Sequence, residues 1–243
     1  MKTFNPTIPN RGTPGWKRAM DIGLILLTLP LLIPVALTTA GIIRLVSRGP
    51  VLFKQERIGR GGKKFLCYKF RTMFAGSNTV SHEGHLRRLI ESDAPMTKMD
   101  RGGDKRIIPL GMFLRATGLD ELPQLINVFL GDMSIVGPRP CLPYEFQYYR
   151  PEQYERFSVV PGLTGLWQVR GKNKTTFQEM IGLDIEYSRR RNLVLDMGII
   201  IKTFPTLLAQ VMDSKDKEAT PTAIPHEERP IQESILPARV ANH

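Results

Sequence analysis

The sequence contains few cysteines and a deficit of acidic residues. Of 243 residues only two are cysteine, Cys67 and Cys141, too few and too far apart for a disulfide framework or a zinc site. We expect both to be small buried hydrophobes in a protein of a reducing compartment. Acidic residues are outnumbered 23 to 34 by basic ones, giving a net charge of +11. This surplus indicates an anionic partner, and nucleic acid, acidic lipid and nucleotide all remain admissible.

Several familiar motifs are also missing. The glycine-rich turn at residues 59–62 is not followed by Gly-Lys-Ser/Thr, which excludes a P-loop. His82 and His85 have no third ligand nearby and lack the zinc-protease spacing, so we expect solvated histidines rather than a metal centre. There is no internal repeat. The length suits one sizeable core, and therefore one catalytic body with attachments.

One long apolar run stands out against these absences. It extends from Ile22 to Ile43 without a charge, and as a straight helix it would cover roughly 33 Å, enough for a bilayer core. Pro30 and Pro34 bend or break such a helix near its middle. Basic residues flank both ends, so the positive-inside rule names no orientation. We favour a re-entrant helix hairpin over a spanning helix, and a buried soluble helix comes third.

A β-hairpin is predicted after this run, with strands at Val51 to Ile58 and Lys63 to Arg71. Residues 44–72 hold nine basic residues and one acid, and for most of them a solvated face beside anionic headgroups is the expected role. Lys69 and Arg71 differ because they alternate with aromatic residues, which on a strand points both charges to one face. Such a pair can clamp a diphosphate.

The stretch at residues 119–124 reads Leu-Asp-Glu-Leu-Pro-Gln. Pro123 suits the first turn of a helix, so the pattern predicts a helix that ends at Gly131. Asp120 and Glu121 then lie at the helix start, where backbone N–H groups are unpaired, and we expect that end to hold phosphate or metal. Acids are common at helix starts, so the pair taken alone also fits an ordinary helix start.

An arginine between two prolines follows at residues 138–140. Pro138 and Pro140 restrict the backbone on both sides of Arg139, so its guanidinium loses little entropy when it binds an anion. Two adjacent acids and a rigidly held cation together indicate phosphate chemistry.

The remaining patterns complete the predicted fold. Ile107 to Leu114 fits a core segment or an interfacial helix, Thr176 to Arg191 fits an amphipathic helix, and Leu193 to Met212 is too interrupted to span a membrane. We expect an α+β fold, mostly helical with a small β-hairpin, an N-terminal re-entrant membrane helix hairpin and interfacial amphipathic helices. The expected divisions are an N-terminal basic segment (1–19), the re-entrant helix (20–48), a catalytic domain (49–212) and a disordered tail (213–243).

Six segments in this order resemble the bacterial sugar transferase family, the monotopic polyprenyl-phosphate phosphoglycosyl transferases. Together they cover roughly residues 16–210, and several ordered motifs of this length are specific where one alone would be weak. The matching segments are Gly49 to Gly59, Tyr68 to Met73, Leu119 to Leu125, Gly131 to Pro140, Pro161 to Gly165, and Leu183-Asp184 with Tyr187.

The resemblance implies a membrane enzyme that begins exopolysaccharide or other surface glycan synthesis. It would move a sugar 1-phosphate from a nucleotide diphosphate sugar, expected to be a UDP-sugar, to polyprenyl (undecaprenyl) phosphate, with Mg²⁺ and release of a nucleoside monophosphate. The implied location is the bacterial inner membrane with the catalytic domain facing the cytoplasm. The implied partners are these two substrates and membrane lipids, without nucleic acid, and a homodimer stays open.

The resemblance also implies roles for individual residues. Asp120 would attack the phosphorus next to the sugar and form a phospho-aspartyl intermediate, and Glu121, with Asp120, would bind the metal. Asp184 and Asp196 occupy family acid positions, where substrate or metal binding, orientation of basic groups and ordinary helix roles all remain open. The expected phosphate clamp comprises Lys69, Arg71, Arg115, Arg139 and Lys172.

Lys172 marks the one departure from the family pattern. It replaces the usual arginine of Gly-Arg-Asn, exchanging a bidentate fork for a point charge. Two other function classes compete with this interpretation. A non-enzymatic basic protein would bind anionic lipid or nucleic acid through residues 44–71, and a lipid-phosphate hydrolase would need no nucleotide sugar.

Overall fold

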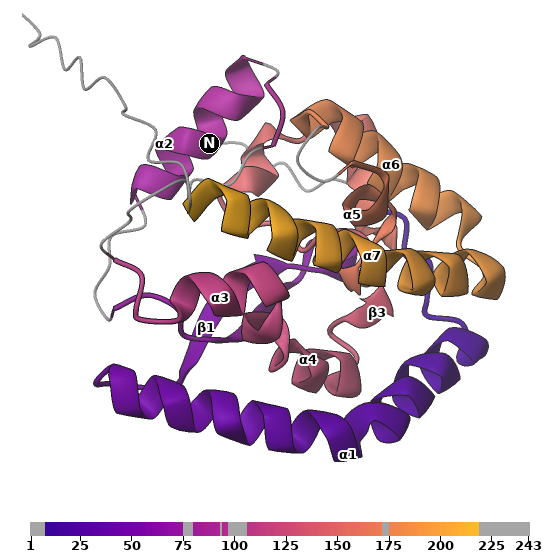
Figure 1. Cartoon of the computed structure of the whole chain (residues 1–243). Helices are drawn as coiled ribbons and strands as arrows, with labels where there is room; N and C mark the ends of the chain where they lie inside the picture. The colour runs from indigo at the N-terminus through magenta and orange to yellow at the C-terminus, as the bar shows by residue number, and fades with distance from the viewer. Residues whose placement is uncertain (1–7, 75–79, 93, 97–105, 172–174, 219–243) are drawn as a thin grey trace, which may run out of the picture.

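The computed structural model describes residues 8–74, 80–92, 94–96, 106–171 and 175–218 (Figure 1). Within these ranges the chain is mostly helical with one small antiparallel hairpin, as the sequence predicts. The α-helices are α1 (Gly15–Val46), α2 (Val80–Glu91), α3 (Gly111–Thr117), α4 (Gln124–Leu130), α5 (Leu166–Gly171), α6 (Phe177–Arg190) and α7 (Leu193–Glu218). The strands are β1 (Leu52–Ile58), β2 (Lys64–Phe70), β3 (Ser134–Val136) and β4 (Gly162–Thr164), and the 3-10 helices are η1 (Arg60–Gly62), η2 (Leu119–Glu121), η3 (Glu145–Tyr148) and η4 (Pro151–Ser158).

Helix α1 is the long apolar element, and in Figure 1 it forms two arms that meet at an obtuse bend. Pro30 and Pro34 lie inside it, where each removes a backbone hydrogen bond and favours a kink. It is the one helix in the described ranges that is long and apolar enough to cross a membrane. Its middle is bare, with Leu27 76% and Leu31 71% exposed.

Two small strand pairs connect the helices. β1 and β2 form the predicted hairpin in antiparallel register, with Ile58 opposite Lys64 at the turn and Phe53 opposite Lys69 toward the open end. The turn is closed by η1, in which Gly61 has a φ of 67° that glycine adopts without strain. β3 and β4 pair in parallel and bring residues 134–136 beside residues 162–164.

An aromatic core lies under η3, η4 and α6. Tyr149, Tyr154, Phe157 and Phe177 are buried there, with ring centroids of neighbouring pairs 5.3 to 6.3 Å apart. Cys141 belongs to the same core and, like Cys67, is buried and unbridged. Both cysteines are therefore the small buried hydrophobes that the sequence predicts.

Several element boundaries differ from the predicted ones. The segment at residues 107–114, expected as a core segment or an interfacial helix, contains the start of α3 at Gly111, and α7 continues beyond Met212 to Glu218. Residues 219–243 of the predicted tail and the side chain of His82 lie outside the described part of the chain. Apolar periodicity indicates where a helix exists but marks its ends poorly.

Candidate active site

The acidic turn Leu119–Glu121 connects α3 to α4. Gly118 has a φ of 74°, which ends α3 and redirects the chain into η2. The N–H of Glu121 donates to the carbonyl of Gly118 at 3.0 Å. Pro123 is the N-cap of α4 rather than a residue of its first turn. The two acids do lie at a helix start, but it is the first turn of the 3-10 helix η2 rather than of α4, because Gly118 starts the helical path earlier.

Asp120 and Glu121 differ in exposure although they are neighbours. Asp120 is 9% exposed, whereas the Glu121 side chain is 42% exposed and accepts a hydrogen bond from Lys69 Nζ at 2.8 Å. Lys69 comes from β2, which packs against η2. The fold thus brings together one predicted cation and the predicted acid pair from segments about fifty residues apart in the chain.

Two more predicted cations lie near the end of the same strand. Arg115 donates through Nε to Thr72 Oγ1 at 2.9 Å, just beyond β2. Arg71 is buried and turns toward the end of α1, donating to the carbonyls of Ser47 at 2.9 Å and Arg48 at 2.8 Å. Lys69 and Arg71 therefore bind different partners, although they lie only two residues apart at the end of β2.

Gly49 explains how Arg71 reaches that position. A Cβ on Gly49 would lie 2.4 Å from Arg71 Nη1, and the φ of Gly49 is 112°, a conformation that L side chains rarely adopt. A glycine three residues after the end of α1 therefore leaves room for the guanidinium to bind the backbone carbonyls of Ser47 and Arg48.

Arg139 forms a second charged cluster, on the far side of the hairpin. Its guanidinium binds Glu145 in a bidentate pair, at 2.8 and 3.1 Å. Burial acts to raise the pKa of Glu145, but the positive charge and hydrogen bonds of Arg139 outweigh it and lower that pKa. Burial acts to lower the pKa of Arg139, but the charge and hydrogen bonds of Glu145 outweigh burial and raise that pKa above its ordinary value.

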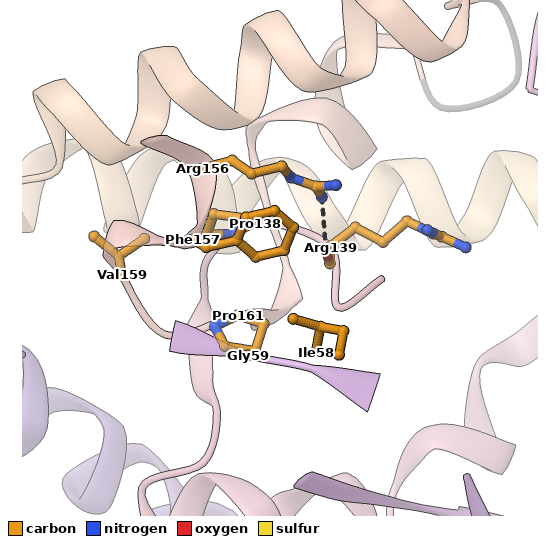
Figure 2. Close-up of a pocket in the computed structure, with 8 residues that line it drawn as sticks. All are labelled: Ile58, Gly59, Pro138, Arg139, Arg156, Phe157, Val159 and Pro161. Atoms are coloured by element: carbon orange, nitrogen blue, oxygen red, sulfur yellow. Dashed lines mark hydrogen bonds between the residues drawn. The ribbon is translucent and has the colours of Figure 1, made fainter. Parts of the chain in front are cut away.

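The backbone around Arg139 is held from several directions. Arg156 donates to the Arg139 carbonyl at 2.8 Å, the contact drawn as a dashed line in Figure 2, and Arg57 donates to the Pro140 carbonyl at 2.9 Å. Figure 2 also shows the Arg139 side chain extending away from the residues that line the adjacent pocket. That pocket has a volume of about 10 Å³, room for about one water. It is a packing void rather than a substrate site.

The hairpin register separates the two clusters. Arg57 pairs with Phe65 at the turn end, and Lys69 lies four residues farther along β2. At about 3.3 Å per residue the two positions are about 13 Å apart along the strand. Lys69 and the Arg139 segment, which Arg57 binds, therefore lie toward opposite ends of the hairpin.

Asp184 and Asp196 are fully buried. Asp184 accepts from Arg156 at 2.5 Å, and burial, opposed by the charge of Arg156, raises the pKa of Asp184 to about 6. Asp196 accepts from Lys17 Nζ at 2.5 Å and from the Tyr187 hydroxyl at 2.8 Å. Each acid therefore holds a cation in the core. Lys172, the fifth cation of the predicted clamp, lies outside the described residues.

A magnesium site would have to be completed by substrate. The described residues contain no group of three or more His, Cys, Asp or Glu side chains that could hold a metal. Asp120 and Glu121 supply two adjacent carboxylates, and Mg²⁺ commonly binds one or two carboxylates together with waters and substrate phosphates. The donor set therefore fits Mg²⁺ delivered with a diphosphate.

Sequence reasoning missed the residues that support these groups. Glu145 and Arg156 lie in an aromatic and charged segment without a clear period. Lys17 precedes the apolar run, and the sequence indicates only that it is one of the basic residues that flank a membrane segment. Asp21 was the available signal, because an acid at the edge of an apolar helix needs a partner. It accepts from the Ser134 hydroxyl at 2.9 Å and the Ile135 N–H at 3.0 Å.

The comparisons with known proteins agree on one family. The family model described as bacterial sugar transferase matches residues 13–210. An exopolysaccharide production protein ExoY of Sinorhizobium fredii is 35% identical, over 79% of this chain and 84% of the relative. A UDP-glucose:undecaprenyl-phosphate glucose-1-phosphate transferase of Caulobacter vibrioides is 40% identical, over 79% and 69%. An undecaprenyl-phosphate galactose phosphotransferase of Salmonella typhimurium is 39% identical, over 66% of this chain and 34% of the relative.

Proposed function

Because the chain belongs to the bacterial sugar transferase family, we propose that it moves a sugar 1-phosphate from a UDP-sugar to undecaprenyl phosphate, the first step of an exopolysaccharide or other surface glycan. The observation that carries this proposal is the acidic turn, in which Asp120 adjoins Glu121 and Glu121 pairs with Lys69 at 2.8 Å. Relatives named as undecaprenyl-phosphate sugar-phosphate transferases support the same reaction class.

Asp120 is the proposed nucleophile. One carboxylate oxygen forms a bond to the phosphorus that carries the sugar, while the bond from that phosphorus to the bridging oxygen breaks and the nucleoside monophosphate leaves with the electron pair. A phosphate oxygen of undecaprenyl phosphate then attacks the same phosphorus, and the Asp120 carboxylate is released. Both substrates are anions and repel each other. A two-step reaction avoids this repulsion, because the nucleoside monophosphate leaves before undecaprenyl phosphate attacks.

The surrounding charges have distinct roles in this proposal. Asp120 and Glu121 would hold Mg²⁺ together with the donor phosphates, and the ion would neutralise charge on the diphosphate. Lys69 moves from Glu121 to the developing charge on the leaving phosphate, which its single ammonium group can follow. Arg139, held at the other end of the hairpin, binds the donor farther from the reacting phosphorus.

We also propose that α1 enters and leaves the membrane on one face, as a re-entrant hairpin. The start of α1 is bound to the body, where Arg18 donates to the carbonyls of Val128 and Phe129, both at 2.5 Å. Its end is bound to the same body through Arg71. At about 1.5 Å per residue a straight α1 would be about 48 Å long, so a helix tethered at both ends with a bare apolar bend favours re-entry over a span.

Three further helices are proposed to lie along the membrane surface. Exposed apolar side chains occur on α3 (Phe113), on α4 (Phe129) and on α7 (Ile201, Phe204). α4 contacts α1, and α3 contacts α7 and the turn η2 that leads into α4 (Figure 1). Apolar groups on helices beside an inserted arm suit the headgroup boundary of the bilayer. On this arrangement the catalytic domain faces the cytoplasm at the inner membrane.

A donor screen tests the reaction. Purified protein in detergent or nanodiscs is incubated with Mg²⁺, undecaprenyl phosphate and UDP-glucose or UDP-galactose, and release of uridine monophosphate is measured. We expect release that requires both lipid and donor. Glu152→Gln, which removes an exposed carboxylate paired with Arg150, is the matched control and keeps this activity. Phosphate release from the lipid without a donor would instead support a hydrolase, and lipid binding without turnover with any nucleotide sugar would support the non-enzymatic alternative.

Labelling of introduced cysteines tests the topology. Cys67 and Cys141 are buried, so single cysteines at Asn10 and Lys54 would report the two flanks of α1 to an impermeant thiol reagent. We expect both positions to react from the cytoplasmic side alone. Reaction of one flank from each side would establish a spanning helix and overturn the re-entrant proposal.

A further inference from the structure

Asn127 is a buried polar residue that the proposed mechanism does not use. It lies in α4 with 0% exposure, and its side chain reaches the outer edge of β2. Nδ2 donates to the carbonyl of Leu66 at 2.7 Å, and the N–H of Tyr68 donates to Oδ1 at 3.0 Å. One side-chain amide thus satisfies both backbone groups of an edge strand, as a neighbouring strand would.

The backbone carbonyl of Asn127 forms part of the C-terminal cap of α4. Its carbonyl accepts from the N–H groups of Gly131 and Asp132 at 3.0 Å and of Met133 at 3.2 Å. Gly131 has a φ of 90° and ends α4 there. Asn127 therefore contributes both to the C-terminal cap of α4 and to the attachment of α4 to β2.

The two elements that Asn127 joins carry the two halves of the proposed site. Lys69 directly follows Tyr68 on β2, and the turn with Asp120 and Glu121 directly precedes α4. We propose that Asn127 is a positioning residue for the transferase reaction: its amide holds α4 in register with β2 and thereby sets the distance between the lysine and the acid pair. This inference rests on the proposed function for its kinetic consequence, while its geometric content can be measured separately.

Asparagine fits this position because of its paired donor and acceptor. Aspartate has the same shape but no N–H for the Leu66 carbonyl, so it places a carboxylate against a carbonyl oxygen in a buried site. Glutamine keeps both groups on a stem longer by one methylene, so the helix has to move by about 1 Å or one bond is lost. A misplacement of about 1 Å in a catalytic arrangement can reduce the rate about 10²-fold.

The experiment compares wild type with Asn127→Asp, Asn127→Gln and a matched control, Thr164→Val. The control also removes a partly buried side-chain hydrogen bond, from Thr164 to Thr203 at 2.8 Å, between β4 and α7. We measure kcat and KM with UDP-glucose and UDP-galactose, the thermal midpoint, and zero-length carbodiimide crosslinking of Lys69 to Glu121 by mass spectrometry.

We expect both Asn127 variants to lower kcat about 10- to 100-fold with KM for the donor changed less than about threefold, and to reduce the 69–121 crosslink. Thr164→Val should lower the midpoint while kcat and the crosslink stay at wild-type values. The kcat losses of Asn127→Asp and Lys69→Met should be non-additive, because both act on one arrangement. Additive losses, or a lower midpoint with kcat and crosslink unchanged, would assign Asn127 a purely structural role and overturn the inference.

One outcome separates this inference from the proposed function. If wild type has no activity with any nucleotide sugar tested, the transferase proposal fails, and the crosslink alone decides whether Asn127 sets the register. If Asn127→Asp does not fold, Asn127→Gln carries the same comparison. An intact crosslink in a folded Asn127→Gln protein with full kcat would sink the positioning role.

Discussion

Glu121 of the acidic turn and the acids of the helical core have opposite surroundings. Glu121 is 42% exposed and its lysine partner is 23% exposed, whereas the neighbouring Asp120 is only 9% exposed. Asp184 and Asp196 are fully buried, and each binds a cation that is equally buried. The same residue types thus occur in two electrostatic environments within one small fold.

The difference indicates which carboxylates are available to react. A buried ion pair adds little net stability relative to apolar replacement, but removing one partner leaves a costly uncompensated charge. Asp196 therefore keeps α1 on α7 through Lys17, and Asp184 holds Arg156 under the Arg139 loop. Separating the partly exposed pair of Lys69 and Glu121 costs little free energy. Lys69 can therefore leave Glu121 when a phosphate binds.

The largest expected effect comes from the surface turn. Asp120→Asn removes the proposed nucleophile, and we expect turnover to fall by at least about 10⁴-fold, with no phospho-enzyme trapped and detected by mass spectrometry. Because the substitution is isosteric, the unfolding midpoint should change much less than turnover. A trapped adduct on another residue, or turnover retained within tenfold, would contradict the assignment.

The second effect belongs to the core. Asp196→Ala leaves Lys17 buried without its carboxylate, and we expect the free energy of unfolding to drop by about 3–5 kcal/mol in denaturant titrations. The double variant Lys17→Met/Asp196→Leu should recover most of that loss, since it removes both charges. A single-variant loss under about 1 kcal/mol would remove the distinction between core and surface acids.

A third effect concerns pH. Because the pKa of Asp184 is raised to about 6 in the folded protein, the folded state binds more protons than the unfolded state between about pH 4 and 6. The Asp184 contribution to stability is therefore greatest at low pH and declines as pH rises to 6, by up to about 3 kcal/mol. Comparing wild type with Asp184→Asn across this range isolates the contribution. A contribution that grows with pH would show that the charge of Arg156 outweighs burial.

The smallest effect is the stability of the surface pair. A double-mutant cycle with Lys69→Met and Glu121→Gln should give a coupling free energy of unfolding below about 1 kcal/mol, because both side chains are partly solvated. Turnover should fall much more than stability in both single variants. A coupling as large as that of the buried pairs would mean that this contact is structural too.

The sequence predicts the surface features of this comparison better than the core ones. The acidic turn, the hairpin with Lys69 and the bent apolar helix follow from local patterns, since proline, glycine and alternation act over a few residues. The pairing of Lys17 with Asp196 spans 179 positions, and no local pattern signals it. No local pattern signals the pairing of Arg156 with Asp184 either, because these two residues lie on separate elements.

Helix ends show the limit of local rules as well. Pro123 suggested the first turn of a helix, whereas the left-handed Gly118 had already started a 3-10 turn. Asn127 looked like one more residue on a helix with an apolar period, because its partners belong to a strand some sixty residues earlier. Tertiary contacts give such residues their meaning, and periodicity does not report them.

The two tethered ends of α1 also affect which membranes suit this enzyme. A helix that crosses a bilayer has to match the hydrocarbon thickness, and it tilts or deforms the lipid where it does not. On the proposed topology, α1 meets a single leaflet and its arms end at a bend, so no second headgroup layer constrains their length. We expect comparable performance in short-chain and long-chain lipids, a tolerance that a spanning anchor would lack.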